Sequence, residues 1–229
     1  DIEREINLQR RAAGPFVIAA GRPTYTRTHA YFLLTYGSAG SLEAMLTADL
    51  AEQSPTPITD VLLWFGHMVL AVQRCHAQQV VHGDIKPENF VLTGGPTRGR
   101  MVAKLTDFGL ASTYADPTRA IGTITYMAPE LLRGQGTSVA SDTWSLGASL
   151  YRMLVGIERY YDDTAEAVAL RLLQRRPQFG QADLEHSLLY RGVSAALRHS
   201  IMGLVAGLMH FDPAQRLPLA KVEAAIRLR

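Results

Sequence analysis

The sequence predicts an α+β fold in which a few short strands accompany a chain that is otherwise mostly helical. Apolar residues recur every three or four positions over residues 58–78, which is typical of an amphipathic helix. Short apolar runs at residues 16–20, 30–36 and 101–106 are bounded by turn residues and indicate strands. A hydrophobic content of 47% with 19% charged residues is typical of a globular chain with a sizeable core.

Charge and composition exclude several classes of protein. The net charge of +2 gives no sign of nucleic-acid binding, and the basic residues 98–100 are better explained as a turn. The single cysteine, Cys75, excludes an internal disulfide and is expected to be a packing residue. No apolar stretch reaches the length of a membrane helix. Nothing in the sequence indicates an oligomeric state.

The N-terminal part is predicted to alternate helices with strands. A charged helix over residues 1–11 ends at Gly14-Pro15, and strands at residues 16–20 and 30–36 follow, separated by a polar turn. A short helix over residues 42–50 and a turn at residues 53–57 then precede the long amphipathic helix. The buried face of that helix is expected to consist of Val61, Phe65, Met68, Val72 and Cys75.

A polar loop between apolar flanks is the most informative stretch. Residues 80–93 read V-V-H-G-D-I-K-P-E-N-F-V-L-T, and Pro87 prevents a continuous helix, so we expect a loop held by short strands. Within it Asp84 can accept a proton, Lys86 can neutralise phosphate charge, and Asn89 can bind a hard cation through its amide oxygen. Together these side chains suit phosphoryl transfer, in which positioning and charge neutralisation supply most of the catalysis.

The C-terminal part adds a second acidic position and several helices. A strand over residues 101–106 leads into D-F-G at residues 107–109, where the Asp107 carboxylate can hold Mg²⁺. Residues 111–121 are polar, lack periodicity and are predicted to form a mobile loop. A buried helix is predicted to have Ser141 as its N-cap and Asp142 at the positive end of its dipole. Apolar spacing predicts further helices over residues 193–208 and 222–226.

A series of short motifs, in this order, resembles those of the eukaryotic protein kinases. They are H-G-D-I-K-P-E-N at residues 82–89, D-F-G at 107–109, A-P-E at 128–130, D-T-W-S-L-G at 142–147 and D-P-A-Q-R at 212–216. The resemblance implies a protein-kinase-like two-lobed fold. Residues 1–36 would be an incomplete small lobe with a regulatory helix and strands. Residues 37–229 would be a mostly helical large lobe with the catalytic loop and activation segment.

The resemblance also implies catalytic roles. Asp84 would orient the substrate hydroxyl and accept its proton, and Lys86 would neutralise charge on the transferred phosphoryl group of ATP. Asn89 and Asp107 would hold Mg²⁺, and Thr123 would contact the catalytic aspartate and lysine. K-P-E-N and G-T-x-x-Y-M-A-P-E favour a protein substrate with serine or threonine over one with tyrosine. Two structural roles are implied as well: Asp142 would support the loop backbone, and Arg216 would pair with Glu130.

The nucleotide site can be assigned in the same way. Glu5 falls where the family's regulatory helix carries a glutamate that pairs with a strand lysine, and Glu3 is the competing choice. The implied adenine-pocket residues are Leu34 at the back, Thr35 and Gly37 through their backbone groups, and Val91 beneath the adenine.

Part of the family pattern does not occur in this sequence. The glycine-rich phosphate loop and the strand lysine precede the regulatory helix in the family, and neither G-x-G-x-x-G nor V-A-I-K is found here. We therefore expect the chain to be a fragment of a longer protein that is weakly active or inactive by itself. The alternative is a kinase-like scaffold that binds a protein partner, although the presence of Asp84, Asn89 and Asp107 favours an enzyme.

Gly83 replaces the arginine of H-R-D, which in the family contacts a phosphate on the activation loop. We therefore expect activity not to depend on phosphorylation at Thr118 in the usual way.

H-G-D is also common in small-molecule phosphotransferases, a less favoured alternative because they normally lack A-P-E and D-x-W-S-x-G. Gly83 and R-L-P-L at residues 216–219 also resemble apicomplexan rhoptry kinases, which would imply export into a host cell. The default expectation is a cytoplasmic location.

Overall fold

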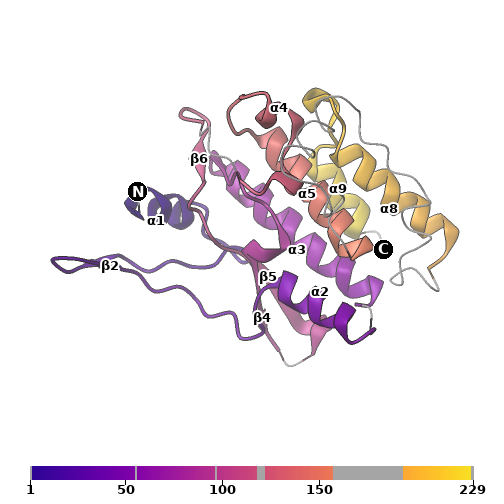
Figure 1. Ribbon diagram of the computed structural model, residues 1–229, viewed down its shortest axis with the longest axis horizontal. Helices are drawn as coiled ribbons and strands as arrows, with labels where there is room; N and C mark the ends of the chain where they lie inside the picture. The colour runs from indigo at the N-terminus through magenta and orange to yellow at the C-terminus, as the bar shows by residue number, and fades with distance from the viewer. Residues whose placement is uncertain (1, 55, 96, 118–121, 157–192, 228–229) are drawn as a thin grey trace.

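A computed structural model describes residues 2–54, 56–95, 97–117, 122–156 and 193–227. Within these ranges the chain has the predicted α+β architecture, with a helical body on one side and a strand-containing N-terminal part on the other (Figure 1). Helix α5 contacts α3 and α8, and α9 contacts α3. The helices of the body are α2 (Leu42–Ala51), α3 (Ile58–Ala77), α4 (Pro129–Leu132), α5 (Val139–Val155), α8 (Ala195–Leu208) and α9 (Leu219–Arg227).

The N-terminal part confirms the first helix but corrects the strands. Helix α1 (Ile2–Arg11) is present, but residues 16–20 form only isolated bridges instead of a strand. Val17 forms one parallel bridge with Leu105, and Ala20 forms one antiparallel bridge with Leu34. Because the stretch changes partner after a single bridge, no continuous strand forms. Strand β2 (Ala30–Tyr31) is shorter than predicted and pairs with β1 (Thr24–Tyr25), which lies in the expected turn. This hairpin extends away from the body, so little packing is available to lengthen it (Figure 1).

Two antiparallel strand pairs enclose the polar loop. β4 (Phe90–Gly94) pairs with β5 (Met101–Leu105), with Phe90 opposite Leu105. β3 (Val80–Val81) pairs with β6 (Ser112–Thr113), so the stretch predicted as a structureless loop begins with a short strand. Residues 118–121, including Thr118, lie outside the described residues. The strands expected on both sides of the loop are confirmed.

Helix α5 is buried along nearly its whole length and lies at the centre of the body. It begins at Val139, so its N-cap is Ser138 and not Ser141 as predicted. The Ser138 hydroxyl accepts from the Ser141 N–H at 3.1 Å, and the Ser141 hydroxyl accepts from the Ser138 N–H at 2.8 Å. This reciprocal capping box explains why either serine suited the end of the helix.

The predicted buried face of α3 is confirmed, since each of its five residues is inaccessible or nearly so. Burial raises the pKa of the Cys75 thiol, as expected for a packing residue.

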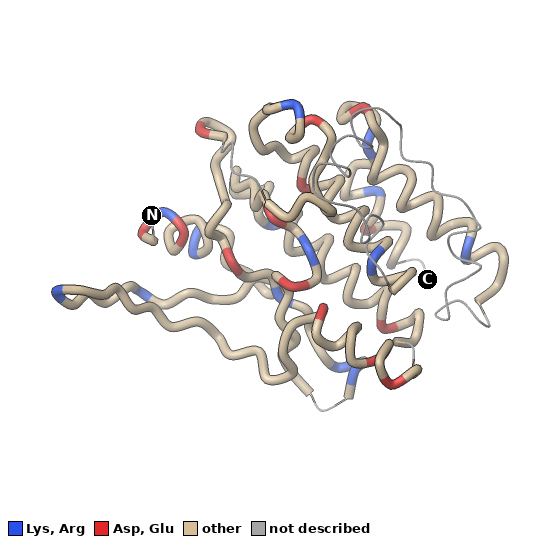
Figure 2. The backbone as a smooth tube through the Cα atoms, in the orientation of Figure 1, with Lys and Arg blue, Asp and Glu red and all other residues tan. Residues whose placement is uncertain are grey.

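None of the helices within the described ranges is long and apolar enough to cross a membrane. Figure 2 shows acidic and basic residues interspersed along the described chain. The expected absence of nucleic-acid binding and the lobe boundary at residue 36 stay predictions.

Candidate active site

The polar loop places its three predicted catalytic side chains together. Strand β3 leads into it, and the 3₁₀ turn Pro87–Asn89 connects it to β4. Lys86 Nζ lies 2.8 Å from Asp84 Oδ2. Asn89 Nδ2 donates to the same carboxylate at 3.1 Å and to the Asp84 carbonyl at 2.8 Å. The spacing of these residues in the sequence therefore becomes one compact cluster.

The Asp84 carboxylate is held in a single orientation by several donors. Burial of this group would raise its pKa, but hydrogen bonds from Lys86, the Thr123 N–H and Asn89 outweigh burial, and the pKa is lowered from its usual value. Asp84 is therefore ionised at neutral pH. An ionised, oriented carboxylate can accept a hydrogen bond from an approaching hydroxyl group.

Thr123 contacts both predicted partners. Lys86 Nζ donates to Thr123 Oγ1 at 2.6 Å, and the Thr123 N–H donates to Asp84 Oδ1 at 3.2 Å. The preceding residue packs just as closely, because a Cβ placed on Gly122 would lie 2.8 Å from Asp84 Oδ1. Residues 122–123 thus form one wall of the site, and a side chain at Gly122 would displace the carboxylate.

The loop backbone is fixed from the first turn of α5. Asp142 accepts from the N–H groups of His82 at 3.0 Å and Gly83 at 2.9 Å, which confirms its predicted structural role. The ring of His76 also bonds the Asp142 carboxylate, at 2.9 Å. His76 belongs to none of the sequence motifs, and no local signal could connect two residues 66 positions apart.

Gly83 fits a backbone conformation that other residues adopt at a cost. Its φ is +82°, in the left-handed region, and a Cβ there would lie 3.0 Å from the Leu110 carbonyl oxygen. Glycine relieves both the strain and the contact. The departure from the family motif therefore gives the loop a relaxed turn immediately before Asp84.

The D-F-G segment turns its phenylalanine inward and its aspartate outward. Phe108 is 1% exposed, and its ring meets that of His82 edge-on with centroids 4.8 Å apart. His82 is also buried, which lowers its pKa. Asp107 is exposed, with a φ of +61° and the Gly109 N–H bonded to its Oδ1 at 3.3 Å. The anchored ring of Phe108 thus determines where the Asp107 carboxylate is presented.

The predicted Mg²⁺ ligands have oxygen atoms free to bind a cation. Asn89 makes its hydrogen bonds through Nδ2, and its Oδ1 has no donor within the described ranges. Among the same residues, the Asp107 carboxylate accepts only the bond from Gly109. A carboxylate and an amide oxygen are hard ligands of the kind that Mg²⁺ prefers, so these two residues fit the ion.

Gly37 lies against Val91, the residue predicted to support the adenine. A Cβ on Gly37 would lie 2.8 Å from the Val91 Cβ, so the backbone of Gly37 contacts this side chain directly. The Gly37 N–H has no acceptor within the described part of the chain and is free to donate to a ligand. The Thr35 N–H is instead bonded to the Ala19 carbonyl at 3.3 Å. Leu34 is 43% exposed and forms a bridge with Ala20.

Glu5, and not Glu3, faces this site. A Cβ on Gly109 would lie 3.8 Å from Glu5 Oε2, whereas Glu3 accepts a hydrogen bond from the Tyr25 hydroxyl at 2.8 Å. Partial burial, followed by repulsion from Asp107, raises the pKa of Glu5 above its usual value. Helix α1 therefore presents Glu5 toward the D-F-G segment.

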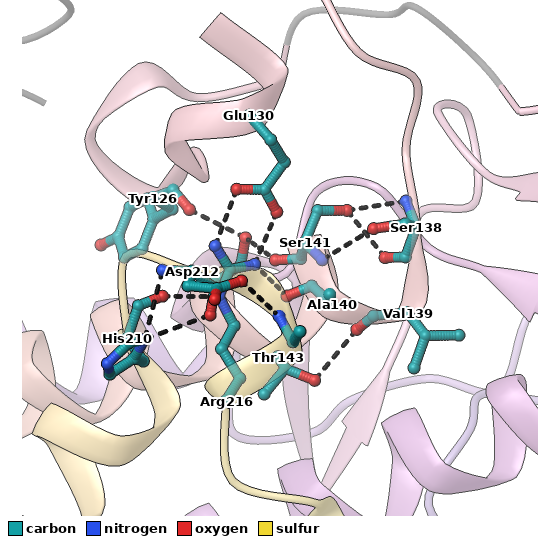
Figure 3. A network of polar contacts seen from close by, with 12 residues as sticks. Tyr126, Glu130, Ser138, Val139, Ala140, Ser141, Thr143, His210, Asp212 and Arg216 are labelled. Carbon is teal, nitrogen blue, oxygen red and sulfur yellow. Dashed lines mark hydrogen bonds and ion pairs between the residues drawn. The ribbon is translucent and has the colours of Figure 1, made fainter. Parts of the chain in front are cut away.

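A buried ion pair ties the A-P-E motif to the C-terminal D-P-x-x-R motif, as predicted (Figure 3). Arg216 donates to both carboxylate oxygens of Glu130, at 2.5 and 2.7 Å. It also donates to the carbonyl of Ala140 in α5 at 2.6 Å, and its guanidinium lies 5.1 Å from the ring centroid of Trp144. The segment after Thr123 is thereby attached to the helical body.

An ionised, oriented carboxylate beside a lysine, with the Asn89 amide bonded to it, defines a site suited to phosphoryl transfer. The family model for the protein kinase domain matches residues 1–225 of this chain. The chain belongs to the protein kinase domain family, as its motifs predicted.

Individual relatives support the same family. The serine/threonine-protein kinase SRK2E of Arabidopsis thaliana is 28% identical over 229 residues, 97% of this chain and 58% of that protein. The cAMP-dependent protein kinase catalytic subunit 3 of Drosophila melanogaster is 31% identical over 173 residues, 75% of this chain and 28% of that protein. The probable serine/threonine-protein kinase KCC4 of Saccharomyces cerevisiae is 26% identical, over 97% of this chain and 20% of that protein.

This chain therefore spans little more than half of the first of these relatives, and less of the others. The resemblance to rhoptry kinases and the cellular location stay predictions.

Proposed function

We propose that this kinase domain transfers the γ-phosphoryl group of ATP to a serine or threonine hydroxyl of a protein substrate. The observation that carries the proposal is the cluster in which Lys86 contacts both Asp84 and Thr123. Two of the relatives above are named serine/threonine-protein kinases, which supports the choice of hydroxyl. Mg²⁺ held by Asn89 and Asp107 would neutralise charge on the ATP phosphates.

The chain's own residues prepare the acceptor side of the reaction. Asp84 is ionised and fixed by its donors, so it can orient the substrate hydroxyl and accept its proton. Lys86 already lies within hydrogen-bond distance of this carboxylate, and its positive charge can stabilise the transferred phosphoryl group. Thr123 bonds both Lys86 and Asp84, so the position of residues 122–123 affects how these two side chains are placed relative to each other.

The decisive experiment uses the full-length protein with Mg-ATP and a mixture of serine, threonine and tyrosine peptides. Asp84→Asn should abolish transfer while leaving the fold intact. Asp60→Asn is the matched control, because it makes the same substitution at an aspartate in the first turn of α3, outside the cluster. Unchanged turnover in the Asp84 variant would contradict the assigned role.

The same experiment separates the alternatives. Nucleotide binding without transfer to any peptide by the wild type would support a scaffold. Transfer to small alcohols but not to peptides would support a small-molecule phosphotransferase. Transfer to tyrosine alone would overturn the choice of serine and threonine.

A further inference from the structure

A cavity of about 460 Å³ lies between helices α3, α8 and α9. Helix α9 contacts α3, and α8 contacts the central helix α5 (Figure 1). None of the described residues lining the cavity belongs to the polar loop or to residues 107–123, so it is separate from the candidate active site. Its volume falls in the range of pockets that hold small molecules, about 300–1,000 Å³.

The described residues that line this cavity are mostly apolar, and none of them is charged. Leucines of α3 face Ile201 and Leu204 of α8 and Ile226 of α9. Of the described lining residues, only Thr59 and His67 have polar side chains, and none is a carboxylate, lysine or arginine. A charged ligand would lose its hydration without gaining a counter-ion, so the wall selects neutral molecules.

His67 gives the wall one hydrogen-bond donor. Its Nδ1 accepts from the Ala103 N–H at 3.3 Å, and its ring stacks on Phe16 with centroids 5.0 Å apart. Burial lowers the pKa of His67 to about 4, so the ring is neutral at physiological pH. Because Nδ1 is the acceptor, the hydrogen sits on Nε2, which has no acceptor within the described residues.

Gly66 keeps the cavity open from the side of α3. A glycine inside a helix costs about 1 kcal/mol relative to alanine. Close packing does not explain it, because a Cβ on Gly66 would meet only Ile226 Cγ2, at the ordinary contact distance of 3.5 Å. The absent side chain leaves space beside His67, the next residue along the helix.

We propose that this cavity binds a neutral, mostly apolar small molecule that offers one hydrogen-bond acceptor to His67 Nε2. The size of the cavity, the absence of charged side chains among its described lining residues and the donor on His67 each restrict the ligand in this direction. The proposal does not depend on the phosphoryl-transfer function, because the two sites share no lining residue among those described.

The test uses matched naphthalene probes and isothermal titration calorimetry on the full-length protein. 2-Acetylnaphthalene carries a neutral acceptor, 2-ethylnaphthalene lacks one, and 2-naphthoate is charged. The ketone should bind about two- to tenfold more tightly than the hydrocarbon, the value of one net hydrogen bond. The carboxylate should bind most weakly. No binding by the ketone, or preference for the carboxylate, would overturn the proposal.

Substitutions test whether the probes bind in this cavity. Gly66→Leu fills the space and should abolish binding, whereas Gly203→Leu in α8 is the control, because a Cβ there meets nothing within 4 Å. His67→Phe should remove the preference for the ketone over the hydrocarbon, a result that general loss of packing would not give. Unchanged ketone affinity in folded Gly66→Leu, or an unchanged preference in His67→Phe, would refute the assignment.

Discussion

Asp142 in the first turn of α5 holds the backbone N–H of Gly83 at 2.9 Å, although 59 positions separate the two residues. The second oxygen of the same carboxylate accepts from His82 and from the ring of His76. An acidic residue far from the loop in sequence therefore fixes the turn that presents Asp84.

Asp142→Asn should destabilise the protein and impair the loop. The amide group would place an N–H donor where the carboxylate now accepts one, leaving at least one buried donor unpaired. We expect a loss of about 2–3 kcal/mol in the free energy of unfolding, measured with urea, and a reduced kcat. A variant within about 0.5 kcal/mol of the wild type would show that Asp142 does not support the loop as described.

Gly83→Ala should cost more than the same change at another left-handed glycine. Gly134 has a φ of +79° and nothing within 4 Å of its Cβ position, so Gly134→Ala measures backbone strain alone, about 1–2 kcal/mol. Gly83→Ala adds the contact with the Leu110 carbonyl and should also lower activity. Equal unfolding free energies for the two variants would mean that the contact is relieved without cost.

The ion pair between Glu130 and Arg216 should show strong coupling. Both side chains are buried, so Arg216→Met leaves an unpaired carboxylate and should cost about 3–5 kcal/mol. Glu130→Leu combined with Arg216→Met should recover much of that loss, since no buried charge remains. Denaturant unfolding of the single and double variants gives the coupling energy. A double variant as unstable as the sum of the two single variants would contradict this account.

Thr118→Ala should leave kinase activity largely intact in the full-length protein. Gly83 offers no cation to a phosphate on the activation segment, and Arg4 of α1 is already paired with Asp116 at 3.1 Å. This exposed pair supplies a link between α1 and the segment that needs no phosphate, although such pairs contribute only about 0–1 kcal/mol. Steady-state rates of wild type and variant provide the comparison, and abolished activity would count against the prediction.

Stability should fall as the pH is lowered from 7 toward 5. Burial lowers the pKa of both His67 and His82 in the folded protein, to about 4 for His67. Unfolded histidine takes up a proton near pH 6.5, so this stability is present above about pH 6.5 and is lost progressively as the pH falls toward the folded value. The loss is at most about 1.4 kcal/mol per pH unit for each histidine.

Urea unfolding at pH 7.5 and 5.5 measures this dependence. His67→Gln retains a side-chain acceptor for the Ala103 N–H but cannot titrate, so the difference between the two pH values should shrink. Asp49 and Asp84 have lowered pKa values and contribute only at more acidic pH. A variant with the same pH dependence as the wild type would show that His67 makes no contribution.

Local patterns predicted the parts of the fold that local chemistry determines. The three- and four-residue spacing identified the buried face of α3, and the residue types in the polar loop identified the cluster of Asp84, Lys86 and Asn89. Strand β1 of the hairpin was missed because it is only two residues long and lies in a polar stretch that predicted a turn. The N-cap of α5 was assigned to the wrong serine, because Ser138 and Ser141 bond each other reciprocally.

Contacts between distant segments were either predicted from the family resemblance or not predicted at all. The pair of Glu130 and Arg216 came from the motifs, since nothing in the neighbouring residues connects positions 86 apart. His76 had no motif and was not assigned its bond to Asp142. The cavity beside Gly66 was not predicted either, because it forms only when three helices from different parts of the chain have packed.

The beginning of α5 carries three attachments within a few residues. Asp142 holds the polar loop, Ser145 Oγ donates to the Tyr126 carbonyl at 2.8 Å, and the Ala140 carbonyl accepts from Arg216. These segments therefore cannot loosen one at a time without disturbing a shared support. We therefore expect a single cooperative unit of local unfolding, in which the polar loop, the segment at Tyr126 and the C-terminal D-P-x-x-R motif are lost or gained together.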